Sequence, residues 1–298
     1  MDDQLQQKLI GCIFGGAIGD VLGSHFENQP AAETASLHDL GLILTDDTQL
    51  TLATCESIAE QRAVVPQKIA EKFLSWHKAR KITRIGAATA KALKELSMGG
   101  HWALVGRKGD YAAGSGAAMR AAPLGFIFNP NNTNDKTIIR DVCRITHHND
   151  EAYVGALAVV CTIYLAINQP QLSGNNTLLE VIKMLPDTRV KDRLILISEL
   201  HPDTSITQAV KIFGNSGYVV ETVPLAFYAF LKGMEMGFIP AIQETVLNGG
   251  DADTIASMAG QMHGGWCGVD ALPQPFIEKV PGKEDIEAVL LEFLEVVS

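Results

Sequence analysis

The sequence predicts an all-α fold, a compact helical bundle in a single domain. Apolar residues recur at the spacing of one helical face through most of the 298 residues, while the alternation of a half-buried strand is nearly absent. Glycine and alanine are frequent inside these patterns. The predicted helices cover a glycine-rich segment near the N-terminus and then residues 50–59, 69–76, 87–96, 153–167, 219–236 and 255–266.

The first predicted helix, within residues 9–19, carries glycines at three- and four-residue spacing. Small residues at this spacing let two helix backbones approach closely, although each glycine costs about 1 kcal/mol of helix propensity relative to alanine. We expect close helix packing to be the role of most of them. These small residues are Gly11, Gly15, Gly16 and Gly19 in the first helix, and Ala256, Ala259, Gly260, Gly264 and Gly265 in the last.

The segment 153–167 is apolar on nearly every side, which predicts a helix at the centre of the bundle. Polar breaks at residues 129–135, 168–176 and 202–205 separate the helices. Each break is too short to link two domains. We therefore expect one domain over residues 1–298.

Composition limits the class of protein. The hydrophobic content of 47% can bury a large core, and no apolar run approaches the roughly 18 residues of a membrane-spanning helix. The first residues, Met1 to Gln4, are acidic where a secretory signal would be basic. A net charge of −10 argues against a general nucleic-acid-binding surface. We expect a cytoplasmic protein that does not bind membranes and has no general nucleic-acid-binding activity.

The five cysteines are scattered through apolar helical patterns, and none forms a Cys-x-x-Cys pair. This distribution predicts buried, reduced thiols. It argues against a disulfide framework and against a structural zinc site.

Two short acidic clusters stand out in a chain with only 19% charged residues. Thr45-Asp46-Asp47-Thr48 follows the apolar run 42–44, and Asp251-Ala252-Asp253-Thr254 follows Gly249-Gly250. Each cluster places carboxylates and a threonine hydroxyl at a predicted helix N-terminus. Oxygen donors suit Mg²⁺ or Mn²⁺ better than Zn²⁺, and four carboxylates balance two divalent cations. The sequence therefore predicts a central dinuclear metal site assembled from distant segments.

Acidic clusters of this kind also occur at ordinary helix N-termini, because Asp and Thr are favoured in caps and first turns. An EF-hand is excluded, because Ile255 and Ala256 occupy the positions where it needs an oxygen ligand and a glycine. The Asp-x-Asp-x-Thr turn of aspartyl-phosphate phosphatases remains an alternative, although Thr254 follows Asp253 directly.

Two further segments carry candidate functional groups. Glu27 follows the first helix on a connection, where it is placed to act as a general base or a gate. The turn Gly114-Ser115-Gly116-Ala117-Ala118-Met119-Arg120 is predicted to open a helix, so its free backbone N–H groups suit a phosphate. It is neither a P-loop nor a dinucleotide fingerprint, because the Lys-Ser/Thr ending and the third glycine are missing.

The segment Thr146-His147-His148-Asn149-Asp150 leads into the apolar helix at Tyr153. Asn149 or Asp150 is expected to cap that helix. Adjacent histidines point to different faces, so they do not form a helical ligand pair for one ion. One of them remains a candidate to contact a substrate phosphate or ribose.

Taken in order, these segments resemble the ADP-ribosylglycohydrolase family, the group that includes the dinitrogenase reductase-activating glycohydrolase. The likeness runs from residue 15 to about residue 268. One departure is Ser115, where many members carry Asn. The matching stretches are Gly15-Gly16-Ala17-Ile18-Gly19-Asp20 with Glu27, Thr45-Asp46-Asp47-Thr48, Gly114 to Arg120, Thr146-His147, and Gly249 to Ala256.

The resemblance implies an all-helical single domain with two Mg²⁺ or Mn²⁺ ions at its centre. It implies catalytic roles for Glu27, Asp47 and Asp253. The implied metal ligands are Thr45, Asp46, Asp47, Asp251, Asp253 and Thr254. The implied substrate-binding residues, which hold the ADP-ribose phosphates and ribose, are Gly114, Ser115, Gly116, Met119 and His147.

The resemblance further implies a hydrolase that removes ADP-ribose from modified proteins or small ADP-ribosyl conjugates. Such an enzyme cleaves the N- or O-glycosidic bond at the ribose anomeric carbon, and bound cations lower the pKa of the attacking water. A Mg²⁺-dependent phosphohydrolase and a catalytically silent ADP-ribose-binding protein are the alternatives. The loops around Glu27 and residues 101–111 are expected to set the choice of acceptor.

Overall fold

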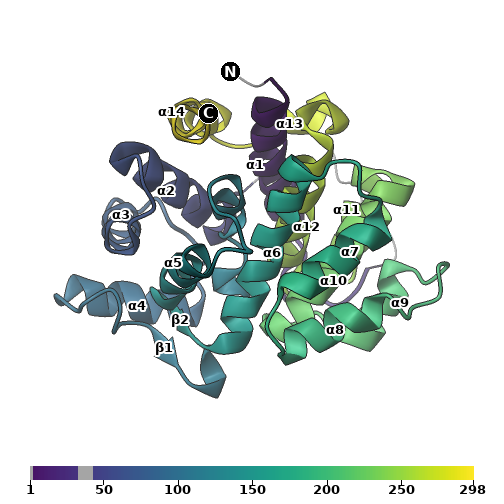
Figure 1. Cartoon of the computed structure of the whole chain (residues 1–298), viewed down its shortest axis with the longest axis horizontal. Helices are drawn as coiled ribbons and strands as arrows, with labels where there is room; N and C mark the ends of the chain where they lie inside the picture. Colours follow the sequence, from purple (N-terminus) through teal and green to yellow (C-terminus); the bar gives the residue numbers. More distant parts are fainter. Residues whose placement is uncertain (1–2, 33–42) are drawn as a thin grey trace.

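A computed structural model describes residues 3–32 and 43–298. Within these ranges nearly all of the regular secondary structure is helical, so the all-α prediction is confirmed (Figure 1). Five long helices form the core. They are α1 (Asp3–Gly23), α2 (Asp46–Gln61), α6 (Asp150–Asn168), α10 (Val219–Met236) and α12 (Ala252–Cys267).

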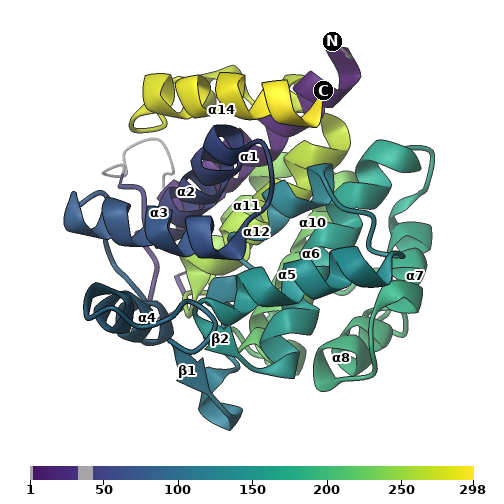
Figure 2. The same cartoon turned by 60° about the vertical axis from the view of Figure 1, so that its left-hand side comes forward.

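The other helices surround this core, with α3 and α4 on one side and α7 and α8 on the other (Figure 2). They are α3 (Pro66–Lys78), α4 (Ala87–Ser97), α5 (Thr133–Arg144), α7 (Gly174–Met184), α8 (Arg189–Ile197), α9 (Ile206–Phe213), α11 (Phe238–Leu247), α13 (Gln274–Ile277) and α14 (Lys283–Val297). The periodicity predicted α3 and α4 and missed the rest of this set. The missed helices have 4 to 15 residues, and most are too short to repeat an apolar face over many turns.

Helices α1 and α12 form the closest contact in the core, and they run antiparallel. A Cβ added to Gly15 would lie 2.3 Å from the carbonyl oxygen of Gly260, and one added to Gly264 would lie 1.9 Å from that of Gly11. The same contact places Gly23, at the end of α1, against Asp253 at the start of α12. The predicted packing role of these glycines is confirmed, and this packing also fixes where one acidic cluster lies.

Helix α6 is the central apolar helix that the sequence predicted. The expectation that no apolar run approaches the length of a membrane-spanning helix is wrong for this segment, because it is long and apolar enough to cross a membrane. However, 78% of its apolar window is buried inside the protein. The core helix of a globular protein meets the same criteria. Its N-terminus is capped by Asn149, whose Oδ1 accepts hydrogen bonds from the backbone N–H groups of Glu151 and Ala152.

Short irregular elements connect the helices near the functional site. Two-residue strands, β1 (Arg107–Lys108) and β2 (His147–His148), pair in parallel. The 3₁₀ helices η1 (Asp110–Ala112), η2 (Ser115–Ala117) and η3 (Ala122–Phe126) lie between β1 and α5, and η4 (Val269–Ala271) follows α12.

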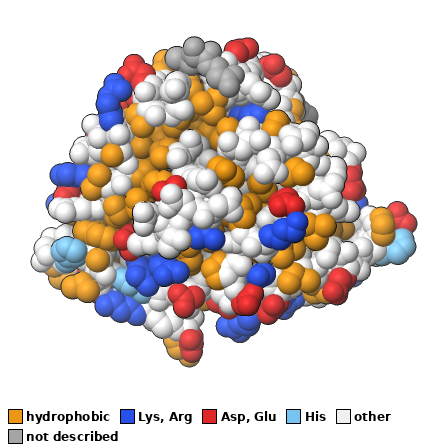
Figure 3. Space-filling model, in the orientation of Figure 1, with side chains coloured by type: hydrophobic (Ala, Val, Ile, Leu, Met, Phe, Trp, Pro, Cys, Tyr) orange, Lys and Arg blue, Asp and Glu red, His pale blue; other side chains and the backbone are white. Residues whose placement is uncertain are grey.

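On the face shown in Figure 3, acidic and basic side chains intermingle between apolar patches.

Candidate active site

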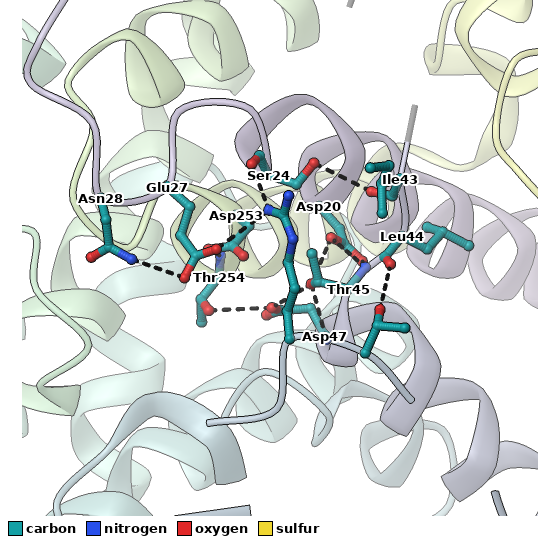
Figure 4. Close-up of polar contacts among 12 residues, drawn as sticks. Asp20, Ser24, Glu27, Asn28, Ile43, Leu44, Thr45, Asp47, Asp253 and Thr254 are labelled. Atoms are coloured by element: carbon teal, nitrogen blue, oxygen red, sulfur yellow. Dashed lines mark hydrogen bonds and ion pairs between the residues drawn. The ribbon is translucent and has the colours of Figure 1, made fainter. Parts of the chain in front are cut away.

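The N-termini of α2 and α12 meet beside the end of α1 (Figure 4). The hydroxyl of Thr254 donates a hydrogen bond of 3.3 Å to Oδ2 of Asp47, across 207 positions of sequence. Packing of α1 against α12 brings these helix ends together. The two acidic clusters are therefore neighbours, as the sequence predicted.

A cavity of about 230 Å³ opens at this junction. Thr45 is the one predicted site residue outside its lining. The predicted residues that line the cavity are Glu27, Asp46, Asp47, Gly114, Ser115, Gly116, Met119, His147, Asp251, Asp253 and Thr254. Further lining residues, for which the sequence suggested no individual role, include Arg84, Thr89, Arg107, Tyr111 and Gly217.

Asp20 anchors the α2 side of the site from the last turns of α1. Its carboxylate is fully buried and accepts hydrogen bonds from the backbone N–H groups and the hydroxyls of both Thr45 and Thr48, at 2.5 to 3.1 Å. The sequence contained Asp20 in a family motif but gave it no role. Thr45 also caps α2, because its Oγ1 accepts from the N–H of Asp47. Its role as a metal ligand stays a prediction.

The carboxylates of α2 are buried with few donors around them. Asp46 accepts a long hydrogen bond of 3.4 Å from the N–H of Gly86. Asp47 is almost fully buried, and its Oδ1 has no hydrogen-bond partner. A buried, unpartnered carboxylate oxygen is costly, so Asp47 is suited to a ligand that supplies positive charge.

The α12 side depends on two glycines in the left-handed region. Gly249 and Gly250 have φ values of 66° and 71°, and a Cβ on either would lie within 2.2 Å of a backbone oxygen. The predicted need for glycine here is confirmed. The turn presents Asp251, whose Oδ2 accepts a 3.1 Å hydrogen bond from the hydroxyl of Ser115. Ser115, which stands where many family members carry Asn, therefore still contacts an acidic side chain.

Burial and mutual repulsion raise the pKa values of the clustered carboxyls. Desolvation is the main cause in each case, and neighbouring carboxylates add to it for Asp46, Asp47 and Asp253. The pKa is raised to about 7 for Asp46, to about 6 for Asp251 and to about 8 for Asp253, and it is raised well above the usual value for Asp47. Divalent cations would relieve this concentration of negative charge.

The donor set fits hard divalent cations, because its members are carboxylate and hydroxyl oxygens and one of them is an orphaned buried oxygen. In the described part of the chain, no three acidic, histidine or cysteine side chains already converge on one point as a metal site. The oxygen donors of the predicted site are thus present, but their side chains do not yet point to a common centre.

Glu27 lies in the turn that follows α1, on the rim of the cavity (Figure 4). Nη1 of Arg84 lies 3.4 Å from its Oε2 and donates a 2.7 Å hydrogen bond to the carbonyl of Ser24. Arg84 itself has a φ of 54°, which is unusual for a residue with a side chain. No local motif in the sequence marks Arg84, which lies 57 positions after Glu27 in the chain.

The Gly114–Arg120 turn differs from the prediction in one respect. It opens short 3₁₀ helices and not an α-helix. Pro123 has no N–H to donate to the carbonyl of Met119, four residues earlier. That carbonyl instead accepts hydrogen bonds from Gln261 at 2.7 Å and from Thr51 at 3.3 Å. The turn is therefore held by α2 and α12, the same helices that carry the acidic clusters.

The two adjacent histidines point in different directions, as predicted. His147 is buried and lines the cavity beside Gly114 and Gly116. His148 turns away, and its Nε2 lies 2.8 Å from the carbonyl oxygen of Val105. Within the segment expected to influence acceptor choice, Tyr111 stands at the rim with 90% of its surface exposed.

Comparison with known proteins identifies the family of this chain. The family model described as ADP-ribosylglycohydrolase matches residues 1–298. The chain belongs to the ADP-ribosylglycohydrolase family. As a member of that family, it is a glycosyl hydrolase that acts on ADP-ribosyl linkages.

Individual relatives agree with this assignment. An uncharacterized protein of Archaeoglobus fulgidus is 30% identical, with 98% of this chain and 97% of that protein covered. Human ADP-ribosylhydrolase ARH3 is 27% identical over 93% of this chain and 90% of its own. The ADP-ribosyl-[dinitrogen reductase] glycohydrolase of Rhodospirillum rubrum is 24% identical over 95% and 93%.

A solved structure shares the family fold. A protein titled "ADP-ribosylglycohydrolase-related protein complex" superposes with a TM-score of 0.72 at 24% identity, and the whole of both chains is covered. The helical arrangement of this ADP-ribosylglycohydrolase is therefore that of a known structure.

Proposed function

We propose that this ADP-ribosylglycohydrolase removes ADP-ribose from a modified protein or a small conjugate in a reaction that depends on Mg²⁺ or Mn²⁺. The bond broken joins the ribose anomeric carbon to the nitrogen or oxygen of the acceptor. The observation that carries the proposal is the meeting of two acidic helix N-termini, with Thr254 and Asp47 in hydrogen-bond contact at the wall of one cavity.

Asp46, Asp47, Asp251, Asp253 and Thr254 would hold two cations, with Thr45 behind them in contact with Asp47. When bound, the cations supply positive charge that orients the ribose hydroxyls and lowers the pKa of a nearby water. The relatives named above support this class of substrate, since their names refer to ADP-ribosyl groups.

Glu27 is placed to accept the proton of the attacking water as the bond from water to the anomeric carbon forms and the bond to the acceptor breaks. The proton then passes to the departing acceptor. Asp47 and Asp253 take part by keeping the cations beside the ribose, one from each helix N-terminus. We assign to the diphosphate the part of the cavity that is bordered by Gly114, Gly116 and His147. The two glycines have no Cβ atom, so a ligand can approach their backbone closely.

The test is a panel of arginine-, serine- and nucleobase-linked ADP-ribose substrates, assayed with Mg²⁺, with Mn²⁺ and after chelation. Asp47→Ala and Asp253→Ala are each expected to lower kcat/KM at least about 100-fold, because each removes a proposed cation ligand. Asp187→Ala is the matched control, since its side chain is 96% exposed on α8's N-terminal side.

The products separate this proposal from its rivals. Free ADP-ribose is expected, whereas inorganic phosphate would indicate a phosphohydrolase. Calorimetric binding of ADP-ribose without turnover of any substrate in the panel would indicate a silent binding protein. Full turnover by the Asp47→Ala, Asp253→Ala double variant would exclude the proposed site.

We further propose that the protein acts in the cytoplasm, without general nucleic-acid binding and without a membrane partner. The support for this is its net charge of −10 and the burial of its single long apolar helix among the described residues.

A further inference from the structure

Arg120 is a buried cation just outside the cavity wall. Only 1% of its surface is exposed, and its guanidinium lies 4.8 Å from the centre of the Phe73 ring. Nη2 donates to the hydroxyl of Thr146 at 2.9 Å and to the carbonyl of Val142 at 3.4 Å. Across residues 3–32 and 43–298, no carboxylate lies within ion-pair distance of Arg120. A buried charge without a counter-ion is costly, so its position calls for a physical reason.

The hydroxyl of Thr146 connects Arg120 to His147. It is completely buried, and its Oγ1 lies 2.7 Å from Nδ1 of His147. A guanidinium only donates, so Arg120 occupies a lone pair of Oγ1. The single hydroxyl hydrogen is then directed to the remaining partner, which is Nδ1 of His147. An Nδ1–H tautomer would instead leave that hydrogen without an acceptor among the contacts of Thr146.

This arrangement fixes the chemistry of the opposite ring nitrogen. With Nδ1 accepting, a neutral imidazole carries its hydrogen on Nε2. Nε2 lies on the cavity side, because Cβ atoms built on Gly114 and Gly116 would be 3.1 and 3.4 Å from it. Burial, then the charges of Arg120 and Arg107, lower the pKa of His147 to about 3, which keeps the ring neutral.

The backbone around His147 is held equally firmly. The N–H of Arg107 donates to the carbonyl of Thr146 at 3.0 Å, and β1 pairs Arg107 with His147 in register. The two-residue sheet thus prevents the peptide from rotating. The tautomer of the ring is thus set by Arg120 and Thr146, which do not line the cavity, and its backbone is held by Arg107, which does.

We propose that Arg120 and Thr146 are positioning residues that lock His147 as the Nε2–H tautomer, so that it presents a hydrogen-bond donor to an anionic oxygen in the cavity. The identity of that oxygen, a phosphate of ADP-ribose, rests on the proposed function. The locked tautomer rests only on the contacts among these three side chains. His148 serves as an internal reference, since its Nε2 bonds a backbone carbonyl and must also carry hydrogen.

The experiment uses full-length protein labelled with ¹⁵N at histidine and two-bond ¹⁵N–¹H correlation spectra, with the His147 signals assigned from a His147→Gln sample. In the wild type we expect a protonated Nε2 and an unprotonated Nδ1. Thr146→Val removes the hydroxyl without changing the shape and is expected to give a mixture of tautomers. Thr146→Ser retains the hydroxyl and is expected to restore the wild-type pattern.

Thr162→Val is the matched control. Thr162 is also a fully buried threonine, but its hydroxyl donates within α6 to the carbonyl of Ala158. In the Thr162→Val protein, the His147 signals should therefore equal those of the wild type. Arg120→Met is expected to resemble Thr146→Val, because the hydroxyl is then free to rotate. If Arg120→Met does not fold, Thr146→Val alone decides the role of the hydroxyl.

Calorimetry with ADP-ribose gives the second readout. Thr146→Val is expected to weaken binding about 10-fold, while Thr146→Ser and Thr162→Val stay within about 2-fold of the wild type. A wild-type Nδ1–H tautomer, or an unchanged His147 spectrum in Thr146→Val, would overturn the inference. A wild-type protein that shows the locked tautomer but does not bind ADP-ribose would overturn the proposed function and support the positioning roles.

Discussion

Asp20 illustrates how a single buried carboxylate organises the site without lining the cavity. It accepts hydrogen bonds from two backbone N–H groups and two hydroxyls at the start of α2. Burial raises its pKa to about 6, and the bonds from Thr48 and Thr45 oppose that rise. The hydroxyl of Thr45 also lies 3.1 Å from Oδ2 of Asp47, so Asp20 and Asp47 together orient it, while both donors of Thr48 depend on Asp20.

Asp20→Ala is expected to lower the free energy of unfolding by about 3 kcal/mol, because several buried donors lose their acceptor. The measurement is urea unfolding followed by circular dichroism. Asp187→Ala should change the value by less than about 0.5 kcal/mol, since that carboxylate is exposed. Equal stability of Asp20→Ala and the wild type would contradict the anchoring role.

At the scale of elements, the antiparallel contact of α1 and α12 positions the acidic cluster of α12. Facing small residues keep the two backbones in contact, as with Gly15 and Gly260 or with Gly19 and Ala256. The same spacing leads to Gly23 beside Asp253 at the site. A change in the distance between these helices would therefore displace half of the proposed metal ligands.

Gly260→Ala is expected to destabilise the protein by about 3 kcal/mol and to weaken Mn²⁺ binding, because the new Cβ would lie 2.0 Å from the carbonyl oxygen of Gly15. Gly174→Ala is the matched control, since its Cβ would meet only the end of the Leu231 side chain at 3.3 Å. Urea unfolding and Mn²⁺ titration calorimetry provide the two measurements. Wild-type Mn²⁺ affinity in a folded Gly260→Ala protein would argue against this role of the helix contact.

At the scale of the whole molecule, folding gathers carboxylates that repel one another and lose water. Their pKa values in the folded state are raised above the ordinary value, to about 6 for Asp251 and about 8 for Asp253. The folded protein therefore binds these protons more tightly than the unfolded chain does. The resulting stabilisation is complete below about pH 4 and is lost as the pH rises through these values.

Without divalent cations, the melting temperature is thus expected to fall between about pH 5 and about pH 8 from this contribution. Added Mn²⁺ should raise it more at about pH 8 than at about pH 5, because cations and protons compete for the same oxygens. Thermal unfolding in chelator and in Mn²⁺ measures both effects. In an Asp46→Asn, Asp253→Asn double variant, both the fall of the melting temperature with pH and its rise with Mn²⁺ should become smaller. An equal effect of Mn²⁺ on the wild type at both pH values would count against cation binding at this site.

Much of the local structure could be predicted from the sequence, because it depends on neighbours in the chain. Thr45 and Asn149 cap helices as their side chains suggested. Gly249 and Gly250 occupy the left-handed region that their position required. The donor chemistry of the two acidic clusters is likewise a property of the residue types.

The sequence predicted that the two acidic clusters meet, but only the tertiary structure decided which individual side chains contact one another. It placed Thr45 behind Asp47, paired Glu27 with Arg84, and joined Arg120 to His147 through Thr146. No pattern within a single segment indicates these contacts, because their partners come together only when separate helices and loops pack. The sequence by itself therefore determined the family, the helices of the core and the chemistry available to the site. The packing of those helices determined which of these side chains lie together at the site, because their partners come from distant parts of the chain.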